Sequence, residues 1–236
     1  MATTTRSPIL DRAIEAYGGE ERWRGIETIK TNASCKGLLA TWKRGHGFDN
    51  LEIEARAWEP WIRLAPLDDG STGILDRHDV TLERNGQVVG TRKSARDRFP
   101  YGRQLFRWDE MDMVYFIGYA FWNYIVMPTL FIRDDIQWTE KSPTKLEAVF
   151  PAEIPTHSNK QRFHFDPDTG LVSQYDYTSK IFGSWAKASH IIEHATSEDG
   201  LVYTSHRLIR PTIAGKPGPK PFPLLFDVRM KNYRAV

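Results

Sequence analysis

The chain has a single cysteine, Cys35, among its 236 residues. One cysteine cannot form an internal disulfide, which excludes a disulfide-stapled scaffold and is typical of a reducing compartment. An excess of one charge is also missing, because 32 Lys and Arg face 30 Asp and Glu and leave a net charge of +2. This balance argues against a dedicated nucleic-acid-binding protein.

Long hydrophobic runs are also missing. The most apolar stretch, residues 113–127, has about 15 residues and includes Asn123, whereas a helix that spans a bilayer needs roughly 20. The N-terminal residues include Asp11 and Glu15 and show no apolar run of signal-peptide length. We therefore predict a cytoplasmic protein with no membrane span.

The usual motifs of nucleotide, serine-hydrolase and dithiol redox sites do not occur: there is no G-x-G-x-x-G, P-loop, G-x-S-x-G or C-x-x-C. One literal motif, H-x-x-E-H, runs from His190 to His194. On a helix these histidines could share one Zn²⁺, but on a strand residues four apart lie roughly 13 Å apart. Because Gly183 precedes this segment and its neighbours alternate, we favour a strand and expect no metal and no cofactor.

Aromatic residues are plentiful, with 8 Trp, 9 Tyr and 12 Phe. Many lie in the apolar segment, which opens with Trp108-Asp-Glu-Met-Asp and so places acids at the positive end of a helix dipole. The sequence predicts a buried central helix here. Tyr119, Trp122 and Asn123 are either core residues of that helix or face a ligand cavity, since buried Tyr and Trp need polar partners.

The remaining patterns predict an α+β protein. Ser7-Pro8 starts a short N-terminal helix that ends at Gly18-Gly19. Apolar and polar residues alternate from about Ile29 and again after the apolar segment, which is typical of strands. Asn85-Gly86 marks a hairpin turn. About ten strands and no convincing linker indicate a single domain over residues 1–236.

This order of elements, a short helix ending in Gly-Gly, long antiparallel strands, a central apolar helix and further strands, resembles the lipoprotein-carrier half-barrels (LolA, LolB and LppX). The resemblance implies one strongly bent antiparallel sheet that wraps the central helix and encloses an apolar cavity. Residues 115–124 and 176–178 also look like segments of a group of uncharacterised bacterial proteins. Similar half-barrels occur as cofactor-free enzymes of aromatic secondary metabolism, so carrier and catalyst both stay open.

Three polar residues of the second half are candidates for acid–base chemistry: His157, Asp176 and His190. An Asp can orient an imidazole as a general base, and Arg207 could hold an anionic ligand. Alternation along a strand places Asp176 on one face and its neighbours Tyr175 and Tyr177 on the other. Either Asp176 or the two tyrosines can therefore line a cavity, but not both. The alternative, which involves no chemistry, is that these polar residues face outward and form cross-strand pairs. The predicted ligand-binding residues are Tyr119, Trp122, Asn123, Tyr177, Trp185 and Arg207.

The sequence therefore predicts a half-barrel that binds an apolar or aromatic small molecule between its sheet and its central helix, as carrier or sensor. The alternative is a cofactor-independent lyase, isomerase or cyclase that acts on an aromatic or terpenoid-like substrate. The sequence leaves the oligomeric state open.

Overall fold

The computed structural model describes residues 6–213, 215–218 and 224–236. Fourteen antiparallel strands form the largest part of its regular secondary structure. In chain order they are β1 (Thr28–Lys36), β2 (Phe48–Arg56), β3 (Trp61–Ala65), β4 (Thr72–Asp76), β5 (Asp79–Arg84), β6 (Gln87–Arg92), β7 (Gln137–Ser142), β8 (Lys145–Val149), β9 (Lys160–Phe165), β10 (Val172–Thr178), β11 (Lys187–Thr196), β12 (Val202–Ile213), β13 (Lys216–Pro217) and β14 (Phe226–Ala235).

All strands belong to one open sheet whose order is β6-β5-β4-β3-β2-β1-β14-β12-β11-β10-β9-β8-β7, with β13 paired to β12. The two halves of the chain meet at β1 and β14, where Ile29 pairs with Ala235 and Lys36 with Asp227. Most other neighbours in the sheet are also neighbours in sequence, which is typical of hairpin connections.

The expected number of about ten strands is too low. Among the strands that the sequence did not reveal are β3 and β4, of 5 residues each, and β7, of 6 residues. Alternation over so few positions is hard to distinguish from irregular structure. Segment 187–196 is a strand, as favoured from the sequence.

Seven helical segments complete the described part: α1 (Pro8–Ala16), α2 (Glu20–Arg24), α3 (Leu38–Arg44), α4 (Glu110–Ile125), α5 (Met127–Ile132) and the 3₁₀ turns η1 (Ala95–Arg98) and η2 (Gly102–Leu105). Helix α1 begins as predicted, because the Ser7 hydroxyl accepts a hydrogen bond from the Ile9 amide at 3.3 Å. In the described ranges, no helix has both the length and the apolar character that crossing a bilayer requires.

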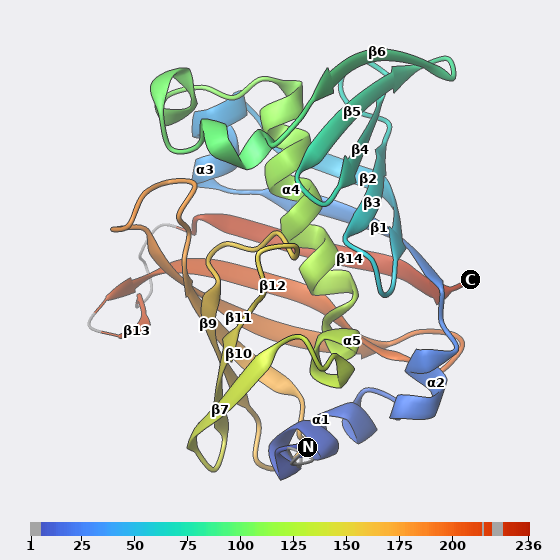
Figure 1. Cartoon of the computed structure of the whole chain (residues 1–236), viewed down its shortest axis with the longest axis vertical. Coiled ribbons are helices and arrows are strands. Elements are labelled where there is room, and N and C mark those ends of the chain that lie inside the picture. The colour runs from blue at the N-terminus through green and yellow to red at the C-terminus, as the bar shows by residue number, and fades with distance from the viewer. Residues whose placement is uncertain (1–5, 214, 219–223) are drawn as a thin grey trace.

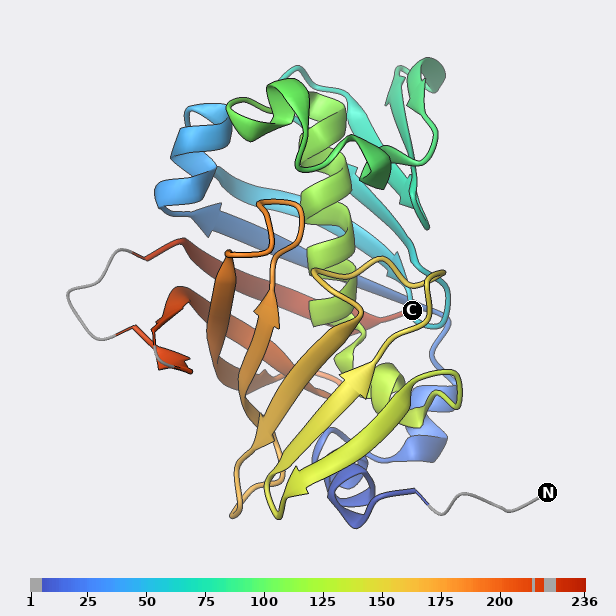
Figure 2. The ribbon, with the colours of Figure 1, turned by 60° about the vertical axis from the view of Figure 1, so that its left-hand side comes forward.

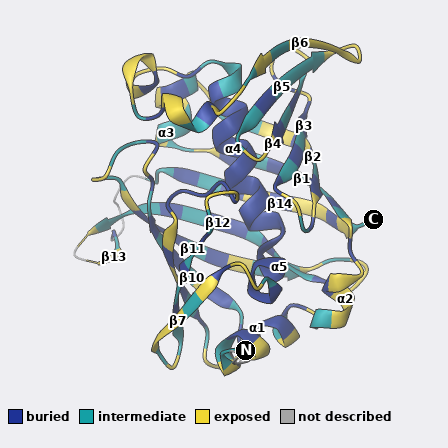
Figure 3. Cartoon of the chain, viewed as in Figure 1, coloured by how far each residue is buried: buried dark blue, intermediate teal, exposed yellow. Residues whose placement is uncertain are grey.

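The central helix α4 starts at a capping box, in which Asp109 and Asp112 each accept a hydrogen bond from the other's backbone amide. All its residues from Asp112 to Ile125 are buried (Figure 3). The helix lies across β14 and β12 (Figure 1), and it also contacts β3, β4 and β5. Contacts on several sides explain why its rings point in all directions.

Two glycines allow α4 to approach the sheet closely. A Cβ added at Gly118 of α4 would lie 2.9 Å from Leu75 Cδ2. A Cβ at Gly73 of β4 would lie 2.4 Å from Val114 Cγ2. Real Cβ atoms do not come this close, so larger residues would push helix and sheet apart.

Candidate functional site

An apolar groove of about 180 Å³ opens beside the inner face of the sheet. Phe116 of α4 and Phe226 of β14 line it, together with α3 and residues 179–188. These segments lie on the same side of the sheet as α4 (Figure 2). Trp42 and Trp185 stand at its rim and are 54% and 75% exposed, although each carries one of the largest apolar side chains of the protein.

The sheet provides the floor of the groove. Tyr177, Ala188 and Pro211 form one row across β10, β11 and β12, and all three line the groove. Ile209, on the same face of β12, lines it as well. Because side chains alternate along a strand, the next inward-facing residue of β12 is Arg207. The groove therefore ends close to polar residues of the interior.

Two larger hollows of the described surface are lined by many charged and polar side chains. One of about 1010 Å³ lies between residues 96–101 and 178–184, and another of about 400 Å³ lies over charged residues of β1 and β2. Ligand sites are usually concave and apolar with a few polar groups, so the apolar groove is the better candidate.

Two histidines form a buried cluster with tyrosines next to the groove. His157 contacts the hydroxyl of Tyr119 through Nδ1 at 3.0 Å and that of Tyr124 through Nε2 at 3.2 Å. His190 Nε2 contacts the hydroxyl of Tyr177 at 2.7 Å and that of Tyr124 at 3.4 Å. The rings of His157 and Tyr177 are stacked at 4.0 Å. Tyr177 thus belongs to both the groove and the cluster.

Burial sets the protonation of this cluster. It lowers the pKa of His157 and of His190 well below 6.5, and the positive charge of Arg207 lowers both pKa values further. Arg96 adds to the effect on His157. Burial also raises the pKa of Tyr177 well above 10. At neutral pH both imidazoles and the phenol are therefore uncharged.

Arg207 lies next to the cluster with none of its surface exposed. Its Nη1 is 3.4 Å from His190 Nδ1, its Nε donates to Thr204 Oγ1 at 3.3 Å and its Nη2 approaches Met127 Sδ at 3.8 Å. The guanidinium carbon is 4.2 Å from the centre of the Tyr124 ring. No Asp or Glu of residues 6–213, 215–218 and 224–236 forms an ion pair with it, and the positions outside these ranges contain neither residue.

Asp176 does not orient either buried histidine, which corrects one sequence hypothesis. It faces away from the cluster, where its Oδ2 lies 2.7 Å from His164 Nε2 and its Oδ1 accepts a hydrogen bond from Ser189. The reason is the alternation noted above, since Tyr175 and Tyr177 point inward and Asp176 outward. His164 and Asp176 are 12 residues apart and meet diagonally across β9 and β10, where the direct strand partner of His164 is Gln174.

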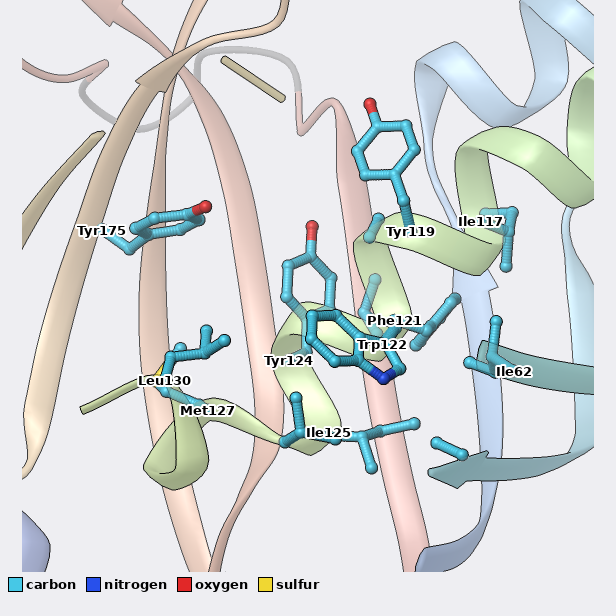
Figure 4. Close-up of a cluster of buried hydrophobic side chains, with 14 of the residues drawn as sticks. Ile62, Ile117, Tyr119, Phe121, Trp122, Tyr124, Ile125, Met127, Leu130 and Tyr175 are labelled. Carbon is cyan, nitrogen blue, oxygen red and sulfur yellow. The ribbon is translucent and has the colours of Figure 1, made fainter. Parts of the chain in front are cut away.

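Three predicted ligand contacts of α4 pack against the protein itself. Trp122 lies among the buried side chains of α4 (Figure 4), and its Nε1 donates to the Arg56 carbonyl at 2.9 Å. The Asn123 amide donates to the carbonyls of Tyr119 and Pro155. Figure 4 also shows Tyr119 and Tyr124 projecting from α4 and Tyr175 from the sheet. Side chains therefore fill the place predicted for the cavity, and the apolar groove lies nearer Phe116.

The two histidines of the H-x-x-E-H segment lie in different environments. His190 belongs to the buried cluster, whereas His194 Nε2 lies 2.8 Å from the hydroxyl of Tyr17. Across the part of the chain that the structure describes, no three His, Cys, Asp or Glu side chains gather closely enough to hold a metal ion.

Some site residues were not predicted. Trp42 lies on α3, a helix of 7 residues that has no clear sequence signal. Phe182 lies in an irregular segment, and its ring stacks on Trp108 at 5.2 Å. Tyr124 is one of the rings of the apolar segment, and only the packing of α4 reveals its contacts with both histidines.

No protein-family model and no curated protein matches the chain. Among solved structures, a LolA superfamily protein from Nitrosomonas europaea is 10% identical and superposes with a TM-score of 0.53 over 99% of this chain and 94% of that one. A domain from Vibrio parahaemolyticus named for outer membrane lipoprotein sorting is 10% identical, with a TM-score of 0.49 over 96% and 91%. A DUF1329 family protein from Desulfovibrio piger is 12% identical, with a TM-score of 0.46 over the same shares. At these identities the likeness concerns the fold, and the first of these structures confirms that the chain has the LolA-like fold which its order of elements predicted.

Proposed function

We propose that the protein binds an apolar small molecule in the groove, as a carrier or sensor. The observation that carries this proposal is an apolar hollow of about 180 Å³ with two exposed tryptophans, Trp42 and Trp185, at its rim. Exposed apolar patches of this kind commonly mark binding sites. The resemblance to the lipoprotein-carrier half-barrels, which implies an apolar cavity, supports the same function.

The lining favours a ligand with an aromatic ring. Trp42, Phe116 and Phe182 offer ring faces and edges, against which a second ring packs well. Ser179 also lines the groove, and its buried hydroxyl has no hydrogen-bond partner among the described residues. A polar atom of the ligand could satisfy it. Burial of about 300 Å² of apolar surface gives roughly 7 kcal/mol before ordering costs are subtracted.

The same proposal covers the whole chain. We propose that residues 1–236 make up one half-barrel domain, as the sequence predicts. The cytoplasmic location and the absence of a nucleic-acid partner stay predictions.

Titration with N-phenyl-1-naphthylamine, a neutral dye that fluoresces in apolar sites, tests this proposal. We expect saturable binding that Ala188→Phe weakens at least tenfold, because Ala188 lies in the floor of the groove and a phenyl ring would fill it. The matched control is Val88→Phe, which adds the same ring at an exposed position of β6. Absence of saturable binding, or equal binding by both variants, would contradict the proposal.

An acid–base enzyme is the second candidate. It is favoured by the contact between the Tyr177 hydroxyl and His190 Nε2, which joins a groove residue to an imidazole. It is disfavoured by the position of that imidazole, which is fully buried and is not among the residues that line the groove. Binding without chemistry is therefore the better supported function.

Native mass spectrometry separates the two candidates. Ligand retained by the purified protein is compared with ligand retained by His190→Ala from the same cells. A carrier yields the same compound from both proteins, in different amounts at most. An enzyme yields a different compound from the variant, because the substrate accumulates there.

A further inference from the structure

Arg207 is a buried cation whose surroundings do not neutralise it. A guanidinium has five N–H donors, yet Arg207 makes only three polar contacts, at 3.3, 3.4 and 3.8 Å, and the longest is to a sulfur atom. The Tyr124 ring adds a cation–π contact. A buried charge without a counter-charge costs several kcal/mol. The buried guanidinium of Arg207 would therefore be stabilised by an anion.

The groups that face Arg207 are neutral. His190, Tyr124 and Thr204 approach it from β11, α4 and its own strand, and Met127 approaches it from α5. None of them carries a negative charge at neutral pH. The anion that would pair with the guanidinium is therefore not part of the described protein.

The groove leads toward this cation. Ile209 lines the groove, and Arg207 is the next residue on the same face of β12, roughly 7 Å further along the strand. From the other side, Tyr177 lines the groove and contacts His190, which in turn contacts Arg207. On this side Tyr177 and His190 separate the apolar groove from the buried charge.

We propose that the ligand of the groove is an acidic amphiphile, whose apolar body occupies the groove and whose carboxylate pairs with Arg207. This inference rests on the proposed function and adds the chemical class of the ligand. A carboxylate matches the guanidinium fork with two parallel hydrogen bonds. The Tyr177 and His190 side chains have to shift to admit the head group, because Tyr177 lines the groove and His190 contacts both Tyr177 and Arg207.

Competition against N-phenyl-1-naphthylamine with octanoate, octan-1-ol and octylamine tests the inference on the unaltered protein. The three compounds share one chain and differ in the charge of the head group. We expect octanoate to bind about tenfold more tightly than octan-1-ol, since hydrogen bonds to a charged group are stronger than neutral ones. Octylamine should bind more weakly than the alcohol.

Two variants test whether Arg207 causes the preference for octanoate over octan-1-ol. Arg207→Met keeps an unbranched apolar side chain and removes the charge, so it should lose the preference for octanoate over octan-1-ol. Arg210→Met removes the same charge from the opposite face of the same strand, where Arg210 donates to the Gly218 carbonyl, and should keep the preference. Circular dichroism checks that both variants fold.

The outcomes separate this inference from the function on which it rests. If the protein binds octanoate and octan-1-ol equally, the groove holds apolar molecules but the carboxylate assignment is wrong. A preference for octanoate that survives in a folded Arg207→Met variant also overturns it. If none of the three compounds displaces the dye and the dye itself does not bind, the proposed function fails and the inference fails with it.

Discussion

The hydroxyl oxygen of Tyr177 lies 2.7 Å from Nε2 of His190 in the interior of the protein. The same tyrosine lines the apolar groove, and its ring stacks on His157. One side chain therefore couples the groove to the buried polar cluster. A ligand that displaces Tyr177 removes the hydrogen bond to His190 and the ring stacking on His157.

Replacement of Tyr177 by Phe should lower the free energy of unfolding by roughly 1–2 kcal/mol, because it removes the closest partner of His190 Nε2 and leaves only Tyr124 at 3.4 Å. Urea denaturation measures the change. Tyr203→Phe is the control, since Tyr203 is half-buried and its hydroxyl makes no hydrogen bond within the described residues. Equal stability of Tyr177→Phe and the unaltered protein would argue against the hydrogen bond.

Two tryptophans should respond in opposite ways. Trp122→Ala should cost about 3–5 kcal/mol of stability, because it empties a core position that is 1% exposed and leaves the Arg56 carbonyl without its donor. Trp185→Ala should change stability by less than about 0.5 kcal/mol but weaken binding of N-phenyl-1-naphthylamine. Thermal unfolding and dye titration on both variants give the two readouts. The reverse pattern would place the ligand beside Trp122.

The pair of Asp176 and His164 should make stability depend on pH. Burial raises the pKa of Asp176, but hydrogen bonds from His164 and Ser189 outweigh it and hold the pKa below 3.8. A carboxyl group with a lowered pKa stabilises the fold above its unfolded-state pKa, and this stabilisation disappears as the pH falls through the folded-state value. Asp176→Asn should therefore cost roughly 1–3 kcal/mol at pH 7.

The cost of Asp176→Asn should shrink below about pH 4, where the carboxylate of the unaltered protein becomes protonated. Urea denaturation at several pH values follows this trend. The exposed Asp134 provides the control, because Asp134→Asn removes a carboxylate that has no buried partner. A cost that does not vary with pH would mean that the charge of Asp176 contributes nothing.

Close contact between α4 and β4 should appear as coupling between Gly73 and Val114. Gly73→Ala should cost about 1–3 kcal/mol, because its Cβ would lie 2.4 Å from Val114 Cγ2. In a Val114→Ala background the same change should cost less than about 1 kcal/mol, since the clashing methyl groups are gone. A double-mutant cycle in urea measures the coupling. Gly25→Ala serves as the control, because a Cβ at Gly25 would make only ordinary van der Waals contacts. Additive effects of the Gly73 and Val114 changes would mean that helix and strand are further apart.

The local sequence determined those helices and strands in which a periodic pattern of apolar residues extends over many positions. Ser7 and Asp109 start the two longest helices, and alternation put Tyr177 and Asp176 on opposite faces of their strand, although only the structure shows that Tyr177 is the one facing inward. These features depend on neighbours within a few residues, so periodicity and capping residues are enough to predict them. The order of these elements was also sufficient to predict the LolA-like fold.

Only the tertiary structure decided which side chains meet. His157, His190 and Arg207 come from a loop and two strands, and Tyr124 comes from a helix earlier in the chain. The register of β10, β11 and β12 and the depth at which α4 docks on them bring these groups together. No local pattern encodes register or docking depth, because both result from packing between residues far apart in sequence. For the same reason the groove formed beside α3 and Phe116, and the place expected at Trp122 became core.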